Sequence, residues 1–185
     1  MQSSEKKYKV GFYIGRFQPY HKGHHSIVQA MQEQCEHIII GLGSAQESET
    51  ERNPFDVQFR TKMIYDSVRP NYNVRVIPIY DRPVPANDYR WGDYVMHQVK
   101  EQTGVIPDAI FEGEEIERES WFTNTGLPIV RVPRDTIPIS GTQIRDILSS
   151  PNYYDDVWDY VPGGNMRNVS EMHKIIRRVK DATKN

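Results

Sequence analysis

One stretch near the N-terminus, KVGFYIGRFQPYHKGHHSI from Lys9 to Ile27, constrains the fold of this chain more than any other. An apolar run ends at Gly15, the cation Arg16 follows directly, and an apolar helical pattern begins after a proline turn. A strand that leads through a glycine turn into a helix commonly binds phosphate, because the helix N-terminus presents unpaired N–H groups and a partial positive charge. We expect Gly15 to let the backbone approach a ligand and Arg16 to bind two phosphate oxygens.

The composition is that of one globular domain with its own core, 185 residues long and 37% hydrophobic. A net charge of -2 excludes a global basic field, so we expect no nucleic-acid partner. The single Cys35 forbids an internal disulfide and fits a reducing compartment. No apolar stretch approaches the ~20 residues that span a bilayer, and the start of the chain lacks the apolar region of a signal peptide. We therefore expect a cytoplasmic protein without a membrane partner.

Apolar runs and helix signals alternate along the chain. The expected strands are Lys6–Ile14, Ile38–Leu42, Asn73–Ile79, Ala109–Phe111 and Leu127–Val132. The expected helices are Gly23–Gln34, one with Asn53 as N-cap and Pro54 at its first position that ends before Pro70, Trp91–Gln102 stopped by Gly104, Ser140–Leu148, Tyr153–Tyr160 and Ser170–Lys180. This alternation predicts an α/β fold with a parallel sheet of about five strands and helices on both faces. Residues 6–150 would form the core and residues 151–185 a helical extension of the same domain.

Most of the unusual polar residues fall in loops that follow predicted strands. These loops are Gly15–His24, Gly43–Arg52, Asp81–Trp91 and Pro138–Arg145. Parallel sheets bind ligands at the carboxyl ends of their strands, so the four loops would share one edge. This coincidence is the strongest argument from the residues for a ligand site.

The phosphate-binding motifs of other enzymes do not match. No G-x-x-x-x-G-K-[ST] string is present, which excludes a P-loop kinase. The segment GLGSAQ follows the second strand and lacks the third glycine of a dinucleotide fingerprint. What remains is H-x-G-H, from His21 to His24, and ISGTQIR, from Ile139 to Arg145.

These two motifs resemble the nucleotidyltransferase superfamily with the HxGH signature. The longer string GRFQPYHKGH is similar to the NadM-type (archaeal-type) nicotinamide-nucleotide adenylyltransferases, as are IGLGSAQ, ERNPF and NDYRW further on. The resemblance covers roughly residues 8–150, with Tyr20 a mild departure before the first histidine. It implies a Rossmann-like doubly wound sheet and transfer of AMP from ATP to nicotinamide mononucleotide (NMN), which gives NAD and pyrophosphate. Some relatives carry a Nudix hydrolase domain, whose string this sequence lacks.

The resemblance also implies roles for single residues. The catalytic set would be His24, His21, Arg16 and Arg145, with His24 most important in the transition state. The ATP-binding set would be Gly15, Arg16, Phe17, His21, His24, Ser140, Thr142 and Arg145. On the NMN side, Trp91 would stack on nicotinamide, Asn87 or Asp88 would bond its carboxamide, and Arg52 would hold a substrate phosphate. The family further implies a homo-oligomer, often a hexamer.

The expected chemistry needs little from the protein beyond positive charge. A phosphate monoester has a second pKa of about 6, so the NMN phosphate is already a nucleophilic dianion and no general base is required. The catalyst must bring anions together and neutralise charge as pyrophosphate leaves. We expect Mg²⁺ to arrive on the triphosphate and expect no metal ligand in the chain, because no dedicated carboxylate cluster is visible.

Several alternatives stay open from the residues alone. Arg145 could be a merely solvated helix residue, Trp91 a core residue, and Arg52 a partner of the neighbouring acids. The basic last helix is either a solvated face or an oligomer contact. At the level of function, the alternatives are an adenylyltransferase for another phosphorylated acceptor and a non-catalytic nucleotide-binding module.

Overall fold

Five parallel strands form one sheet in the computed structural model, which describes residues 5–68, 73–82, 90–114, 120–133 and 139–184. The strands are β1 (Tyr8–Gly15), β2 (Cys35–Leu42), β3 (Asn73–Pro78), β4 (Ala109–Gly113) and β5 (Ile129–Val132). Their order across the sheet is β3-β2-β1-β4-β5, and every neighbouring pair is parallel. The winding therefore reverses between β1 and β4, and their carboxyl ends flank the crevice in which such sheets bind ligands.

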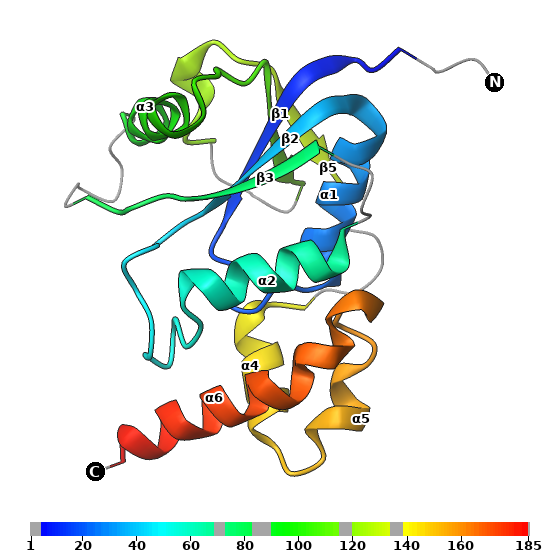
Figure 1. Cartoon of the computed structure of the whole chain (residues 1–185), viewed down its shortest axis with the longest axis vertical. Coiled ribbons are helices and arrows are strands. Elements are labelled where there is room, and N and C mark those ends of the chain that lie inside the picture. The colour runs from blue at the N-terminus through cyan, green and yellow to red at the C-terminus, as the bar shows by residue number, and fades with distance from the viewer. Residues whose placement is uncertain (1–4, 69–72, 83–89, 115–119, 134–138, 185) are drawn as a thin grey trace.

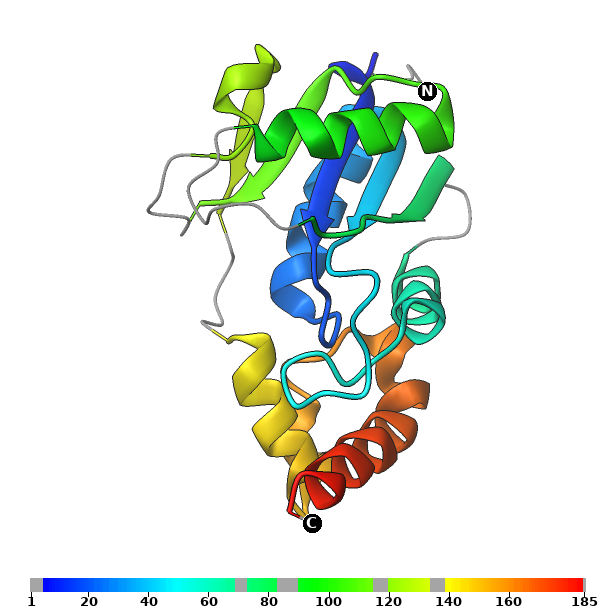
Figure 2. The ribbon, with the colours of Figure 1, turned by 90° about the vertical axis from the view of Figure 1, so that its left-hand side faces the viewer.

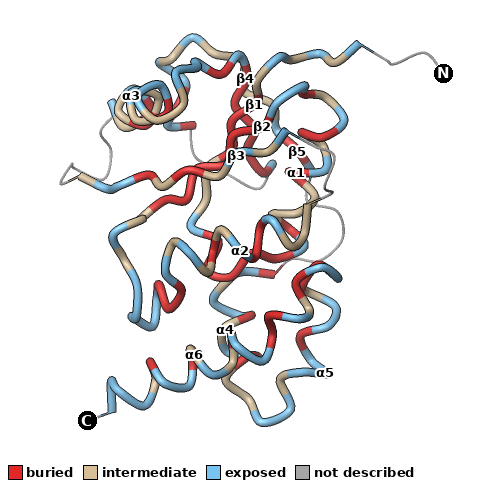
Figure 3. The backbone as a smooth tube through the Cα atoms, in the orientation of Figure 1, coloured by how far each residue is buried: buried red, intermediate tan, exposed pale blue. Residues whose placement is uncertain are grey.

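Helices cover both faces of this sheet (Figures 1 and 2). The helices α1 (Lys22–Gln34) and α2 (Val57–Ser67) bury apolar residues in one core cluster, and α3 (Trp91–Thr103) with the 3-10 turn η1 (Thr123–Thr125) borders the other. Successive side chains of a strand point to opposite faces of the sheet, so Phe12 of β1 packs in one core cluster and Tyr13 in the other. Figure 3 shows the buried residues gathered along the strands and between the layers. The predicted fold class is confirmed.

The C-terminal quarter of the chain adds a helical layer beyond the carboxyl ends of the strands (Figure 2). It contains α4 (Gly141–Ser149), α5 (Tyr153–Val157), the 3-10 segment η2 (Gly163–Asn168) and α6 (Val169–Ala182). Leu148, Val157, Met172 and Ile176 join these elements to the core cluster that also contains α1 and α2. No helix in the described part of the chain combines the length and apolar character that a membrane crossing requires.

Most predicted elements are present with shifted ends. The second strand begins at Cys35, which pairs with Tyr8 of β1, three residues before the expected start at Ile38. The same cysteine is the C-cap of α1. The first C-terminal helix is shorter than expected, and η1 and η2 were not predicted. Gly104 ends α3 in a left-handed conformation, with φ of 74°, as expected for a helix stop.

The predicted start of α2 is wrong. Asp56 is the N-cap, because its carboxylate accepts the Phe59 N–H at 2.7 Å, whereas Asn53 and Pro54 lie outside the helix. The segment before the cap instead makes hydrogen bonds to residues outside the helix. The Asn53 N–H donates to Thr50 Oγ1, and the Phe55 backbone binds a side chain from the turn after β1. The local signals for a helix start, an N-cap residue followed by a proline, are therefore overridden here by a tertiary contact.

Candidate active site

The helix α1 begins with two histidines that cap it reciprocally. His21 is the N-cap, and its Nδ1 accepts the Gly23 N–H at 3.1 Å. His24 occupies the third helical position, and its Nδ1 accepts the His21 N–H at 3.4 Å. The two rings stack with centroids 3.7 Å apart. The H-x-G-H spacing is therefore a capping box, in which imidazoles replace the usual Ser and Glu side chains.

This cap fixes which nitrogen of each neutral ring carries the proton. A ring nitrogen that accepts a backbone N–H cannot itself be protonated, so the proton sits on Nε2 in both His21 and His24. Each Nε2–H is a donor in addition to the backbone N–H groups at the start of α1. The rings of Phe17 and His24 pack edge to face, with centroids 4.8 Å apart, which holds the second ring in place. The start of α1 therefore presents donors suited to an anion.

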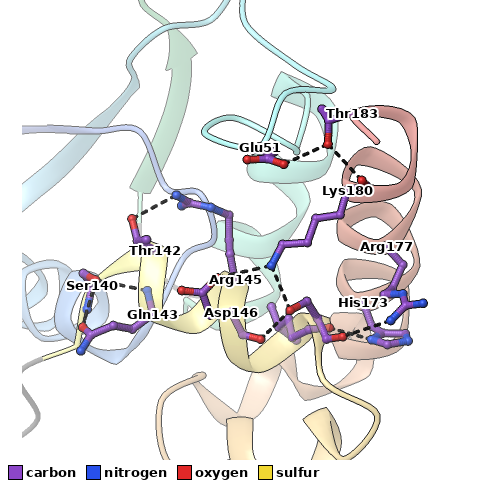
Figure 4. Close-up of polar contacts among 12 residues, drawn as sticks. Glu51, Ser140, Thr142, Gln143, Arg145, Asp146, His173, Arg177, Lys180 and Thr183 are labelled. Carbon is purple, nitrogen blue, oxygen red and sulfur yellow. Dashed lines mark hydrogen bonds and ion pairs between the residues drawn. The ribbon is translucent and has the colours of Figure 1, made fainter. Parts of the chain in front are cut away.

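The helix α4 starts beside α1 with a second capping box. Ser140 Oγ accepts the Gln143 N–H at 3.3 Å, and Gln143 Oε1 accepts the Ser140 N–H at 2.9 Å. Gly141 permits the close approach of this helix start to the turn after β1, because a Cβ there would lie 2.8 Å from the Gln18 carbonyl oxygen. Arg145 donates to that same oxygen at 2.7 Å. It also donates to Thr142 Oγ1 at 3.1 Å (Figure 4).

The two helix starts enclose a cavity of about 220 Å³. Its lining includes every residue of the predicted ATP-binding set except Gly15: Arg16, Phe17, His21, His24, Ser140, Thr142 and Arg145. Gln18 and Gly141 complete the wall. Residues more than a hundred positions apart in the sequence thus meet at the carboxyl edge of the sheet.

Positive charge is concentrated at this edge. Burial, and after it the charge of Arg52, lowers the pKa of the Arg16 guanidinium, while Asp81 opposes the shift. Burial followed by Arg16 also lowers the pKa of Arg145, with a smaller contribution from Arg52 and an opposing one from Asp146. Arginine keeps its charge despite such shifts. Like charges that repel one another in the free protein are stabilised when a polyanion binds among them.

Arg52 lines a second cavity, of about 310 Å³, that shares Thr142 and Arg145 with the first. Within the described residues Arg52 makes no ion pair or side-chain hydrogen bond, so the alternative that it pairs with the neighbouring acids does not hold. It is exposed on the loop before α2. Its charge therefore faces the edge shared by both cavities.

Gly15 and Trp91 do not line either of these cavities. A Cβ at Gly15 would lie 3.0 Å from the Phe17 ring, so the glycine makes room for that side chain. Trp91 begins α3, half-buried against Tyr94 and Trp121, with ring centroids 5.5 and 6.3 Å away. Its buried Nε1 has no acceptor among the described residues. The predicted Asn87 and Asp88 lie outside the described residues.

Comparison with known proteins places this chain in a family whose model spans both motifs. The family model described as cytidylyltransferase-like matches residues 12–147. The nicotinamide-nucleotide adenylyltransferase of Methanothrix thermoacetophila is 49% identical over 173 residues, which cover 92% of this chain and 90% of the relative. The chain belongs to this family. The adenylyltransferase of Methanosarcina barkeri is 36% identical over 90% of each chain. The predicted membership among the nicotinamide-nucleotide adenylyltransferases is confirmed.

Solved structures share the fold of this adenylyltransferase-family chain. A bifunctional NMN adenylyltransferase/ADP ribose pyrophosphatase from Francisella tularensis superposes with a TM-score of 0.73 at 20% identity, over 96% of this chain. The chain spans 54% of that protein's length. The same protein crystallised with AMP and a manganese ion gives a TM-score of 0.64.

Two side chains that hold the site together were not predicted. Gln18 is buried and forms a pair of hydrogen bonds with the Phe55 backbone, at 2.8 and 2.9 Å, which joins the turn after β1 to the segment before α2. Arg60 of α2 is fully buried and donates to the carbonyl oxygens of Arg16, Gly43 and Ser44, so it holds the exits of β1 and β2. Burial lowers the pKa of Arg60 to about 10. A charged residue on the inward stripe of α2, one turn before Ile64, was the available signal.

Proposed function

We propose that this chain transfers the adenylyl group of ATP to the phosphate of NMN, forming NAD and pyrophosphate. The observation that carries this proposal is the pair of capped helix starts that face one cavity, with Arg16 and Arg145 between them, in a chain of the adenylyltransferase family. Such an array suits a triphosphate, which has several anionic oxygens to bind at once.

In the proposed reaction an oxygen of the NMN phosphate attacks the α-phosphorus of ATP. A P–O bond forms to the acceptor, the bond between the α-phosphorus and its bridging oxygen breaks, and pyrophosphate leaves with the electron pair. No proton has to move, since the attacking phosphate is a dianion near neutral pH. The protein contributes alignment of the two anions and charge that compensates the leaving group.

On the triphosphate side, the Nε2–H groups of His21 and His24 donate to phosphate oxygens, with His24 acting on the charge that develops in the transition state. Thr142 and Arg145 bind the triphosphate from α4, and Arg16 from the turn after β1. The cap at Ser140 orients the backbone N–H groups of α4 toward the same anion. Because the cavity wall supplies donors and cations, Mg²⁺ enters bound to the ATP phosphates as part of the substrate.

On the acceptor side, Arg52 binds the NMN phosphate and Trp91 stacks on the nicotinamide ring. The charge of Arg52 acts on both Arg16 and Arg145, which supports a substrate phosphate shared among the three side chains. The exposed edge of the Trp91 and Trp121 cluster supports an aromatic ligand at the start of α3. The proposal includes the carboxamide contact of Asn87 or Asp88, a cytoplasmic location and a homo-oligomer.

The test is product analysis with purified protein. ATP, Mg²⁺ and NMN should give NAD and pyrophosphate in equal amounts. Chromatography measures the NAD, and a coupled assay measures the pyrophosphate. Nicotinate mononucleotide, pantetheine phosphate and FMN serve as competing acceptors. Faster turnover with any of these than with NMN would assign another acceptor, and no product with any acceptor would overturn the enzymatic proposal.

A further inference from the structure

The end of α6 forms one wall of the cavity that contains Arg52. Ile176, Val179 and Lys180 of α6 face Arg52 and Arg145 across this space, whose volume is about 310 Å³. Figure 4 shows α6 lying beside α4 and the loop before α2, with polar contacts to both. The C-terminal helix therefore reaches the two arginines from the side opposite the sheet.

The loop before α2 surrounds Arg52 with acidic residues, and α6 binds two of them. Arg178 forms an ion pair with Glu49 Oε1 at 2.8 Å. Thr183, the C-cap of α6, donates its hydroxyl to Glu51 Oε1 at 2.9 Å. Arg52 itself has no such partner within the described residues. Two carboxylates that could neutralise Arg52 are thus held by a helix more than a hundred residues further along the chain.

The helix that holds these carboxylates is itself fixed to the active site. Ile176 and Val179 are 3% and 4% exposed, so α6 is anchored by apolar burial. Lys180 Nζ lies 3.0 Å from Ser149 Oγ and 3.4 Å from Asp146 Oδ1, both on α4. Since α4 also carries Arg145, one helix sets the position of both the loop acids and the helix that bears the catalytic arginine.

Glu51 and Arg52 line the same cavity, yet both loop carboxylates are bound by α6 and neither pairs with Arg52. We propose that the end of α6 is a positioning element that keeps Glu49 and Glu51 from pairing with Arg52, and so keeps the Arg52 charge available to a substrate phosphate. Arg178 and Thr183 are its positioning residues. This inference rests on the proposed function for the identity of that phosphate, as the one NMN carries. Its physical basis is competition: a guanidinium that pairs with a neighbouring carboxylate must break that pair before it binds an anion. Because the loop contacts are solvent-exposed, their loss should change affinity modestly.

The experiment compares the double variant Arg178→Gln/Thr183→Val with the wild-type protein. The KM for NMN should rise about threefold and kcat should stay within about twofold, because only ground-state competition for Arg52 changes. Adding Glu49→Gln and Glu51→Gln to this background should return the KM to the wild-type value, since the competing charges are gone. Lys174→Gln removes one cation from the same helix and has no partner among the described residues, so it should leave the KM unchanged.

The rescue separates charge competition from mechanical support. If Glu49→Gln/Glu51→Gln alone raises the KM as the double variant does, α6 acts only by bracing the loop and the inference is wrong. An unchanged KM in the double variant also overturns it. Calorimetric binding of inorganic phosphate to the same variants gives a readout without turnover. If the wild-type protein makes no NAD, the proposed function fails, whereas the inference is still tested by the phosphate affinities of the variants and their rescue.

Discussion

The helices α1 and α4 begin with the same kind of reciprocal cap, built from different side chains. Both use a capping box and both face the same cavity. In α4 the Ser140 hydroxyl is used entirely within the box, since it accepts the Gln143 N–H and donates to Gln143 Oε1. In α1 each imidazole uses one nitrogen for the cap and retains an Nε2–H. The comparison teaches that the histidines add donors for a ligand to a cap that other residues make equally well.

The largest effect should follow from giving α1 the cap of α4. His24→Gln places at the third position of α1 the residue that Gln143 supplies in α4, so the cap persists while the imidazole donor is lost. We expect kcat for NAD formation to fall about 10²–10³-fold, as on removal of a transition-state donor. The free energy of unfolding should change by less than about 1 kcal/mol. Initial rates and urea denaturation measure the two quantities.

Gln143→Ala is the matched control for this variant. It removes the equivalent cap residue from α4 and should cost about 1 kcal/mol of stability with little change in kcat. If both variants lost turnover equally, the two helix starts would have the same role and the distinction between them would be wrong.

A smaller effect is expected from Arg145→Lys. Lysine keeps the charge, but its point-like ammonium cannot donate to the Gln18 carbonyl and Thr142 Oγ1 in the fixed fork that Arg145 provides. Loss of charged hydrogen bonds predicts a fall in kcat/KM of about tenfold to hundredfold. Arg177→Lys is the control, because Arg177 is an exposed residue of α6 whose weak bond to the Ser149 carbonyl oxygen, at 3.5 Å, a lysine can also make, and it should keep wild-type rates. Wild-type kcat/KM in Arg145→Lys would show that charge alone suffices at this position.

Next in size is the contact that brings α4 to α1. A methyl group at Gly141 would lie 2.8 Å from a backbone oxygen that cannot move freely, so Gly141→Ala should reduce the free energy of unfolding by about 1–3 kcal/mol. Gly163→Ala is the control, because a methyl group there would have nothing within 4 Å and its backbone is not left-handed. Thermal denaturation of the two variants measures the difference. Equal stability would mean that α4 can withdraw from the turn after β1 without cost.

The sheet and the location of the site could be predicted from the sequence for simple reasons. Apolar runs such as Ile38–Leu42 mark buried parallel strands, and parallel strands must end at one edge. The shared edge alone predicts that His24 and Arg145 lie near each other, although 121 positions separate them in the sequence. Both residues line the cavity. Local patterns thus specify which elements form and which loops meet.

The contacts that fix the site could not be predicted, because they join distant segments through single side chains. The Gln18 bonds to Phe55 replace the expected helix start at Asn53, and no local signal distinguishes the two. Besides the local Asp56 carbonyl oxygen, the buried Arg60 guanidinium binds three carbonyl oxygens of distant segments in place of water, and only the folded structure brings these together. The role of α6 near Arg52 depends likewise on contacts across the whole chain.

The smallest expected effect tests the α4 side of the comparison. Ser140→Ala removes an N-cap oxygen that is used within the box, so it should lower the free energy of unfolding by about 1 kcal/mol and leave kcat within about threefold. Ser140→Asn should restore the stability, because asparagine is an equally good N-cap. Urea denaturation and initial rates of both variants measure these effects. A loss of turnover as large as that of His24→Gln, with the stability recovered in Ser140→Asn, would show that the serine hydroxyl contacts the substrate after all.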